Sequence, residues 1–141
     1  MAINPYLIFD GEGKEAVTFY AQVFGIEQYP LMTFGDSPQD PSYTLPEEAK
    51  NLVMHAMLEI NGAKLMFSDT FPGQPFLKGN NISLAYVSSD EAENVQIFEA
   101  LAKGGDIIMP LQKTFWSKSY GSLKDRYGIE WQVSLEDSTE A

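Results

Sequence analysis

The side chains that could carry out chemistry in this chain are few and mostly uncharged. Its 141 residues contain a single histidine, His55, and no cysteine, so thiolate catalysis, thiolate metal sites and disulfides are excluded together. His55 lies in an apolar run, 53–60, where strand alternation places it on the same face as Met57 and opposite Leu58. We consider His55 a candidate acid or base, although one histidine cannot assemble a metal site.

Other combinations of reactive side chains are weaker candidates for a catalytic site. The serines lie in no nucleophile elbow and have only one histidine to activate them, which disfavours hydrolase chemistry. Asp69 and Glu59 could pair as acid and base, although carboxylates near hairpin ends usually face water. Asp125 and Arg126 follow a predicted strand and are typical of a surface turn with a salt bridge.

A glycine motif near the N-terminus matches a known fingerprint. Residues 11–16, Gly-Glu-Gly-Lys-Glu-Ala, fit the dinucleotide-binding pattern between a strand and a helix, and Asp36 follows at a suitable distance. However, predicted hairpins follow instead of further helix crossovers, and Glu12 and Glu15 would oppose a pyrophosphate. We interpret the glycines as a tight turn from strand to helix.

The charge balance excludes several partners. The chain carries 9 basic and 20 acidic side chains, for a net charge of −11. Such a chain repels nucleic acids and anionic membrane surfaces, so we expect neither as a partner. No apolar run is long enough to cross a bilayer and the N-terminus does not resemble a signal peptide, which together with the absent cysteines favours a cytoplasmic location.

The first half of the chain predicts a strand, a helix and three further strands. The apolar runs 3–9, 29–34, 53–60 and 63–68 have strand character, and the last two flank Asn61-Gly62, a strong signal for a tight hairpin. Helical spacing places Ala16, Phe19, Tyr20, Val23 and Phe24 on one face of a helix that ends at Gly25. Residues 35–51 contain three prolines and are expected to form a long loop, either a lid or a subunit contact.

The second half repeats this order. Strands are predicted at 81–87, 107–111, 115–123 and 129–135, with a helix whose apolar face carries Val95, Phe98, Leu101 and Ala102. Ser88 and Glu91 form a plausible capping box at its start, and Gly104-Gly105 ends it. The repeat predicts an α+β fold with two βαβββ modules, about 1–75 and 76–141, in a single domain of 141 residues.

A long, ordered set of motifs links the chain to a known family. These are Tyr6-Leu7-Ile8-Phe9-Asp10-Gly11, Met54-His55-Ala56, Ser68-Asp69, Asn80-Asn81-Ile82-Ser83-Leu84, Met109-Pro110-Leu111-Gln112-Lys113-Thr114-Phe115-Trp116, Tyr120-Gly121, Asp125-Arg126-Tyr127-Gly128 and Trp131. They resemble the PhnB-like branch of the glyoxalase/bleomycin-resistance superfamily, also called vicinal oxygen chelate. The resemblance implies paired βαβββ modules whose curved mixed sheets surround a cavity, and a homodimer that can exchange modules between subunits.

The resemblance also indicates where a metal would bind. In metal-dependent members, His, Gln or Glu side chains from four strands meet at a divalent ion. The corresponding positions here are Pro5, the window from Met66 to Ser68, Asn81 and Gln132. Only Asn81, Gln132 and Ser68 offer an oxygen, and neutral amides without a carboxylate or imidazole bind such ions weakly. We therefore expect no metal and no cofactor.

Strand alternation predicts the wall of the cavity. The side chains expected to face it and to bind a ligand are His55, Ser68, Asn81, Ser83 and Gln132, with Trp116 stacking on the ligand. This mixed wall suits an uncharged or weakly charged organic molecule. We therefore expect a small-molecule-binding homodimer.

Two alternatives to pure binding stay open: an enzyme, and a structural or regulatory dimer with a vestigial pocket. An enzyme of the lyase, isomerase or dioxygenase type could use His55 directly as acid or base, or together with a metal and a carboxylate. Some branch members carry the label 3-demethylubiquinone 3-methyltransferase, but the sequence shows no doubly wound site for a methyl donor of the adenosylmethionine kind. We do not expect methyl transfer.

Overall fold

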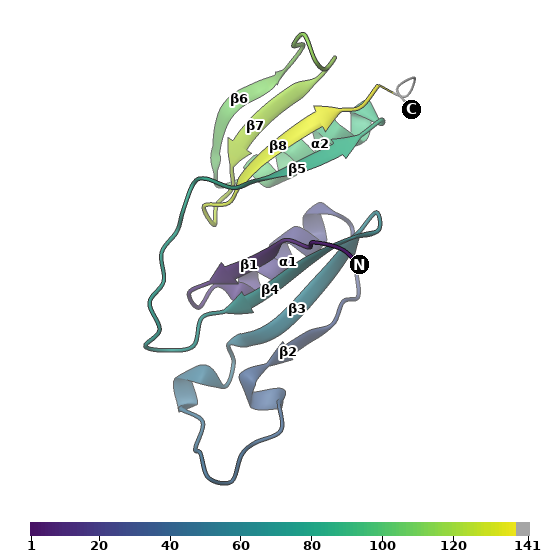
Figure 1. Cartoon of the computed structure of the whole chain (residues 1–141). Coiled ribbons are helices and arrows are strands. Elements are labelled where there is room, and N and C mark those ends of the chain that lie inside the picture. Colours follow the sequence, from purple (N-terminus) through teal and green to yellow (C-terminus); the bar gives the residue numbers. More distant parts are fainter. Residues whose placement is uncertain (138–141) are drawn as a thin grey trace. The chain divides into compact units, whose positions relative to one another are not determined.

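The chain forms two compact units, each built from one sheet and one helix. The computed structural model describes residues 1–137, with the first unit at Met1–Leu77 and the second beginning at Lys78. Each unit has a four-stranded mixed sheet and one α-helix (Figure 1). The predicted α+β class with two βαβββ modules is therefore confirmed. Within residues 1–137, no helix is long and apolar enough to cross a membrane.

The first unit has the strand order β1-β4-β3-β2. Strand β1 is parallel to β4, and the other neighbours are antiparallel. Its elements are β1 (Tyr6–Phe9), α1 (Gly13–Val23), β2 (Leu31–Thr33), the 3₁₀ turns η1 (Phe34–Asp36) and η2 (Glu47–Ala49), β3 (Val53–Ile60) and β4 (Ala63–Asp69). Asn61 and Gly62 have φ angles of 49° and 88°, the left-handed backbone that the predicted hairpin turn requires.

Helix α1 fills the core of the first unit. Its spacing of apolar residues puts Ala16, Val17 and Tyr20 on one buried face, where all three are fully shielded from solvent. The ring of Tyr20 stacks on Phe67 of β4 with 5.8 Å between centroids. Alternation along β4 puts Phe67 on the helix side and Ser68 on the opposite side.

The second unit has the strand order β5-β8-β7-β6 and the same pattern of parallel and antiparallel neighbours. Its elements are β5 (Ser83–Ser88), α2 (Glu91–Ala102), β6 (Asp106–Gln112), β7 (Tyr120–Lys124) and β8 (Glu130–Leu135). Helix α2 buries Ile97, Phe98 and Leu101. Alternation along β8 puts Trp131 and Val133 on the helix side.

The start of α2 differs from the prediction. The N-cap is Asp90, whose carboxylate accepts from the N–H of Glu93 at 3.1 Å, so the predicted Ser88–Glu91 capping box is wrong. Ser88 instead accepts from the N–H of Asp90 at 3.0 Å. Val95, which was expected in the buried face, is 37% exposed. The buried Asn94 lies on the core side and donates to carbonyls on both β5 and β8.

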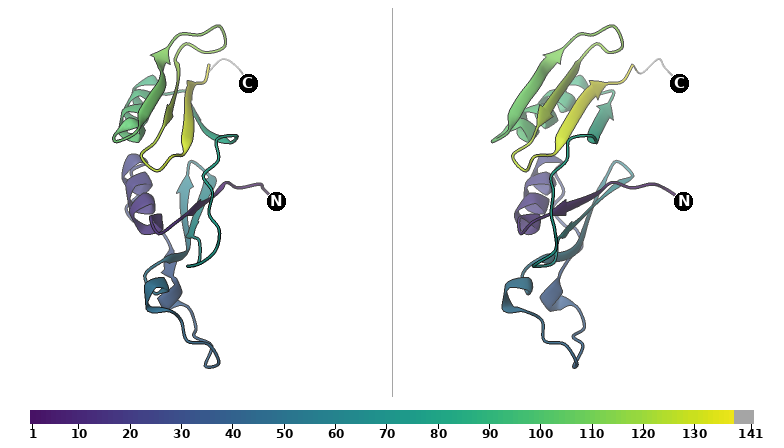
Figure 2. Two further views of the ribbon diagram at one scale, coloured as in Figure 1. Left: turned by 90° about the vertical axis from the view of Figure 1, so that its left-hand side faces the viewer. Right: turned by 60° about the vertical axis from the view of Figure 1, so that its left-hand side comes forward.

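Each helix covers one face of its own sheet and leaves the other face without that cover (Figures 1 and 2). We call the face of the β1-β4-β3-β2 sheet turned away from α1 the first open face. It carries Tyr6, Ile8, Met32, His55, Met57, Met66 and Ser68. The second open face is the face of the β5-β8-β7-β6 sheet turned away from α2. It carries Ser83, Ala85, Val87, Tyr120, Ser122, Gln132 and Ser134.

Candidate ligand-binding site

A chain of three hydrogen-bonded side chains crosses the second open face. The hydroxyl of Tyr120 on β7 donates to Oε1 of Gln132 at 2.8 Å, and Nε2 of Gln132 donates to Oγ of Ser83 at 2.7 Å. Gln132 occupies β8, the strand between β5 and β7, so it can reach a partner on each side. Both ends of its amide are therefore held in a fixed orientation.

The connection between β6 and β7 places two aromatic rings next to this chain. Trp116 is 56% exposed, and its ring lies 5.2 Å from that of Tyr120 in an edge-on arrangement. Phe115 lies 4.7 Å from Trp116 and is almost fully exposed. Residues 115–119 are thus a loop and not the predicted strand, because Ser117 and Thr114 close a turn here.

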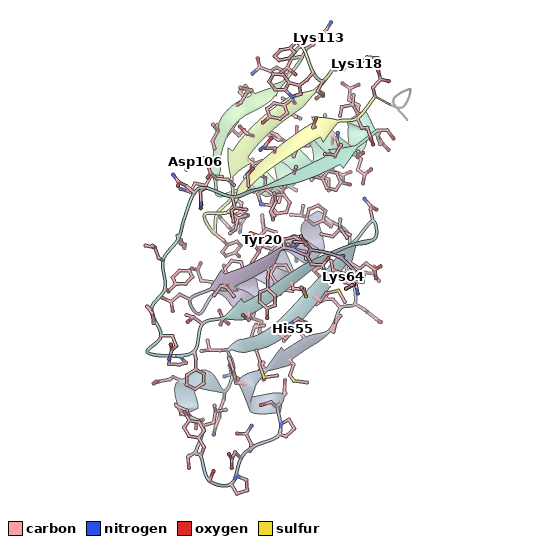
Figure 3. All side chains as sticks on the ribbon, in the orientation of Figure 1. Tyr20, His55, Lys64, Asp106, Lys113 and Lys118 are labelled. Carbon is pink, nitrogen blue, oxygen red and sulfur yellow. The ribbon has the colours of Figure 1, made fainter. Side chains whose placement is uncertain are left out.

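The same loop borders a hollow in the second unit. The hollow has a volume of about 430 Å³, within the range of small-molecule sites. It is lined by the loop residues 113–118, by Ser89 and Glu91 at the start of α2, and by residues 135–137. Lys113 and Lys118 mark the two ends of the loop (Figure 3). Trp116 lines the hollow and contacts Tyr120, so it connects the hollow with the hydrogen-bonded chain.

His55 lies on the first open face, in the other unit (Figure 3). Its Nδ1 lies 3.3 Å from the hydroxyl of Tyr6, and the two rings are 6.0 Å apart. Strands β3 and β4 are antiparallel, and Ala56 pairs with Phe67. The preceding residue on β3, His55, therefore lies next to the following residue on β4, Ser68. His55 and Ser68 therefore share one face, as strand alternation predicted.

The structure brings the predicted site residues together in two groups. His55 and Ser68 lie in the first unit, whereas Ser83, Gln132 and Trp116 lie in the second and are connected through Tyr120. Asn81 precedes β5 and is exposed, whereas Ser83 on β5 accepts a hydrogen bond from the side chain of Gln132.

The sequence analysis missed Tyr6 and Tyr120. The alternation that was applied to the other strands could have found both, because Tyr6 shares its face with Ile8 and Tyr120 shares its face with Ser122.

The four positions that correspond to metal ligands do not suit a divalent ion. Pro5 offers only its carbonyl oxygen, which accepts from the N–H of Met66 at 3.1 Å. The amide of Gln132 is bonded to Tyr120 and Ser83. In residues 1–137, no three His, Cys, Asp or Glu side chains form a group that could hold a metal ion. The donor set thus lacks the carboxylates and imidazoles that such ions prefer.

The glycine motif before α1 binds a side chain of the protein itself. The N–H groups of Gly11 and Gly13 donate to Oδ1 of Asp69 at 3.0 and 2.8 Å, and the N–H of Val53 donates to Oδ2 at 2.8 Å. These amides are therefore engaged where a dinucleotide would need them for phosphate. Asp36, the other part of the fingerprint, bonds locally to Thr33.

Two carboxylates that were expected to face water are buried. Asp69 is 4% exposed and points to the helix side of β4, whereas Glu59 is exposed, so the proposed acid–base pair of Asp69 and Glu59 is not formed. Asp125 is 3% exposed, and it accepts from the N–H groups of Tyr127 and Ile129 and from Nε1 of Trp131. Both aspartates hold backbone turns together and are unavailable to a ligand.

A family model described as 3-demethylubiquinone-9 3-methyltransferase matches residues 1–134. The chain belongs to this PhnB-like family. The match covers both βαβββ modules and the polar chain through Gln132, so the resemblance inferred from the sequence motifs is confirmed.

Solved structures of PhnB-like and more distant proteins support the assignment. Protein PA1353 from Pseudomonas aeruginosa is 39% identical, with a TM-score of 0.84 over 96% of this chain and 98% of that one. The PhnB protein from Bacillus cereus is 32% identical, with a TM-score of 0.73 over 96% of this chain and all of that one. The fosfomycin resistance protein FosX from Listeria monocytogenes, 11% identical with a TM-score of 0.60 over 98% and 94% of the two chains, shows the glyoxalase/bleomycin-resistance fold alone.

Proposed function

We propose that this PhnB-like protein binds a small organic molecule in the hollow beside Trp116 and along the second open face, without a resident metal ion. The observation that carries the proposal is the hydrogen-bonded chain Ser83–Gln132–Tyr120, which ends at a half-exposed tryptophan next to a hollow of about 430 Å³. An oriented polar chain beside an exposed aromatic ring is typical of ligand sites.

The hydrogen-bonded residues Ser83, Gln132 and Tyr120 indicate which chemical groups the ligand carries. After the two observed bonds, Gln132 keeps a second amide hydrogen by valence, and the Tyr120 hydroxyl keeps its acceptor lone pairs. These groups suit neutral acceptors and donors such as carbonyl, amide or hydroxyl groups. The ring of Trp116 can stack on a flat part of the same molecule. Lysines and carboxylates both line the hollow, which favours a ligand with little net charge.

A ligand screen with matched variants tests the proposal. Thermal unfolding is followed in the presence of a panel of metabolites and antibiotics, because a ligand at one hundred times its Kd adds about 2.7 kcal/mol of stability. We expect Gln132→Leu and Trp116→Ala to abolish the shift, and Gln96→Leu, on the exposed surface of α2, to keep it. A shift that survives both site variants would place the ligand elsewhere and overturn the proposal.

The metal-free part of the proposal has its own test. We expect the purified protein to contain no stoichiometric divalent metal. We also expect its unfolding midpoint to stay unchanged with Ni²⁺, Zn²⁺, Mn²⁺ or a chelator, because no carboxylate or imidazole lies at the four corresponding positions. A clear midpoint shift with one of these ions would contradict it.

The contact between Tyr6 and His55 favours a second candidate function, an enzyme that uses His55 as acid or base. The Tyr6 hydroxyl lies 3.3 Å from Nδ1 and can orient the ring, so that Nε2 is left to exchange a proton with a substrate. If turnover of a screened ligand is detected, we expect His55→Ala to abolish it. Turnover unchanged in that variant would eliminate this candidate.

Methyl transfer is not part of the proposal. The glycine turn that could have cradled a nucleotide cofactor is bonded to Asp69, and each unit has one helix on a small mixed sheet instead of a doubly wound sheet.

The family resemblance also leads us to propose a homodimer, which light scattering of the purified protein would test.

A further inference from the structure

Three methionines surround His55 on the first open face. Met32 on β2 is the cross-strand partner of His55, and Met57 lies two residues further along the same face of β3. Met66 on β4 is the cross-strand partner of Met57. We call Met32, Met57, Met66 and His55 the methionine cluster.

The spacing of His55, Met57 and Met66 allows their donor atoms to converge. Directly opposed residues of an antiparallel pair, such as Met57 and Met66, have Cβ atoms about 4.5–5.5 Å apart, and diagonal neighbours, such as His55 and Met66, are about 7–8 Å apart. A methionine has three rotatable side-chain bonds ending in a thioether, so Met57 and Met66 can turn their sulfurs toward a point shared with the imidazole. Met32 lies on β2, two strands from Met66, which is too far for both sulfurs to share one ion. Met32 is 41% exposed and the other two are half-buried, which gives a small ion access to all three.

The contact with Tyr6 engages one nitrogen of His55 and leaves the other for a ligand. The contact between the Tyr6 hydroxyl and Nδ1 directs that nitrogen toward β1. Nε2 is then turned away from Tyr6. The charged residues nearest along the two strands, Glu59 and its cross-strand partner Lys64, have opposite signs and lie beyond Met57 and Met66. The ligands themselves are thus thioethers and an imidazole.

This donor set selects a particular class of metal. Soft thioether ligands favour monovalent copper, whereas magnesium, calcium and manganese prefer carboxylate and carbonyl oxygens. We infer that the methionine cluster is a binding site for a cuprous ion, with the thioether sulfurs of Met57 and Met66 and Nε2 of His55 as ligands. On binding, the ring proton moves from Nε2 to Nδ1, which then donates to the Tyr6 hydroxyl oxygen. This site lies on the first unit, so it goes beyond the ligand site proposed on the second, and one can fail without the other.

Competition for cuprous ion tests the inference. The full chain is titrated anaerobically with Cu(I) against bicinchoninate. We expect the wild-type protein to remove one equivalent of copper from the competitor. Met57→Leu/Met66→Leu, which keeps side-chain volume but removes two thioethers, should weaken the affinity by at least about tenfold. Met109→Leu, on β6 of the other sheet, should change it by less than about twofold, because that thioether is not part of the cluster.

A spectroscopic measurement distinguishes coordination by the cluster from nonspecific metal binding to methionines elsewhere in the protein. With ¹³C-labelled methionine methyl groups and Ag(I) as a redox-stable probe, the resonances of Met57 and Met66 should shift while that of Met109 stays in place. The inference is overturned if the wild-type protein fails to compete with bicinchoninate or if the double variant binds copper like wild type. It is also overturned if Met109 shifts as much as the cluster. The methionines would then be an adaptable apolar surface only.

Discussion

Gly13 lies so close to Asp69 that a Cβ at position 13 would collide with the carboxylate. Its N–H donates to Oδ1 of Asp69 at 2.8 Å, and a Cβ added to it would lie 2.7 Å from Oδ2. Residues separated by 56 positions are thus in direct contact, and this contact fixes the turn between β1 and α1 against the end of β4.

The first prediction concerns the stability that this contact provides. Asp69→Ala leaves three N–H groups, two of them buried, without their acceptor, so we expect the free energy of unfolding to fall by about 3 kcal/mol or more. Gly13→Ala should also destabilise, by about 1–3 kcal/mol, because its methyl group collides with the carboxylate. Urea unfolding measures both, with the exposed Glu59→Ala as control.

The two changes should not be additive. Once Asp69 is removed, the methyl group of Gly13→Ala no longer meets a carboxylate, so the double variant should be less destabilised than the sum of the single variants. Additive losses would show that the clash is relieved elsewhere and would contradict this interpretation of the contact.

The second prediction concerns the buried Asp125. In Asp125→Asn an amide N–H₂ can come to face Nε1 of Trp131, which is itself a donor, and we expect a loss of about 1–3 kcal/mol. The fluorescence emission of the buried Trp131, followed during urea unfolding, measures this loss of stability. Asp106→Asn, an exposed residue at the start of β6, should leave stability within about 0.5 kcal/mol of wild type.

The third prediction concerns the tautomer of His55. A phenol hydroxyl can donate to Nδ1 only when that nitrogen carries no proton, so the neutral ring should have its proton on Nε2. Tyr6→Phe removes this donor, and the ¹⁵N shifts of the ring should then move toward a mixture of both tautomers. Identical shifts in the variant and the wild type would show that Tyr6 does not orient His55.

The fourth prediction concerns the pH response of the 3₁₀ turn η1. The N–H and then the hydroxyl of Thr33 hold the pKa of the Asp36 carboxyl below its usual value. Since the folded pKa is lowered, this stabilisation is present above the pKa of the unfolded chain and is lost as the pH falls through the folded pKa.

We therefore expect the amide signals of residues 33–37 to move toward a more open turn in acid. Asp36→Asn should remove this response, because the variant has no titrating carboxyl at this position. A turn that stays unchanged below the folded pKa would contradict the assignment.

The order of the helices and strands, and the face on which each strand residue lies, follow from the sequence alone. Short-range rules were sufficient for this, because a hairpin at Asn61-Gly62 needs only left-handed backbone, and an amphipathic helix such as α1 needs only the spacing of Ala16 and Tyr20. Alternation along β3 and β4 likewise placed His55 and Ser68 on one face.

The contacts of the polar side chains depend instead on how distant segments pack together. The acceptor role of Asp69 depends on N–H groups of Gly11 and Gly13 that are distant in sequence, and the role of Asp125 depends on the position of Trp131 across the turn. Tyr120 joined the site because the loop before it turns through Ser117, so that the strand predicted to begin at Phe115 begins at Tyr120. Such contacts follow from long-range packing of both sheet faces, which local patterns do not specify.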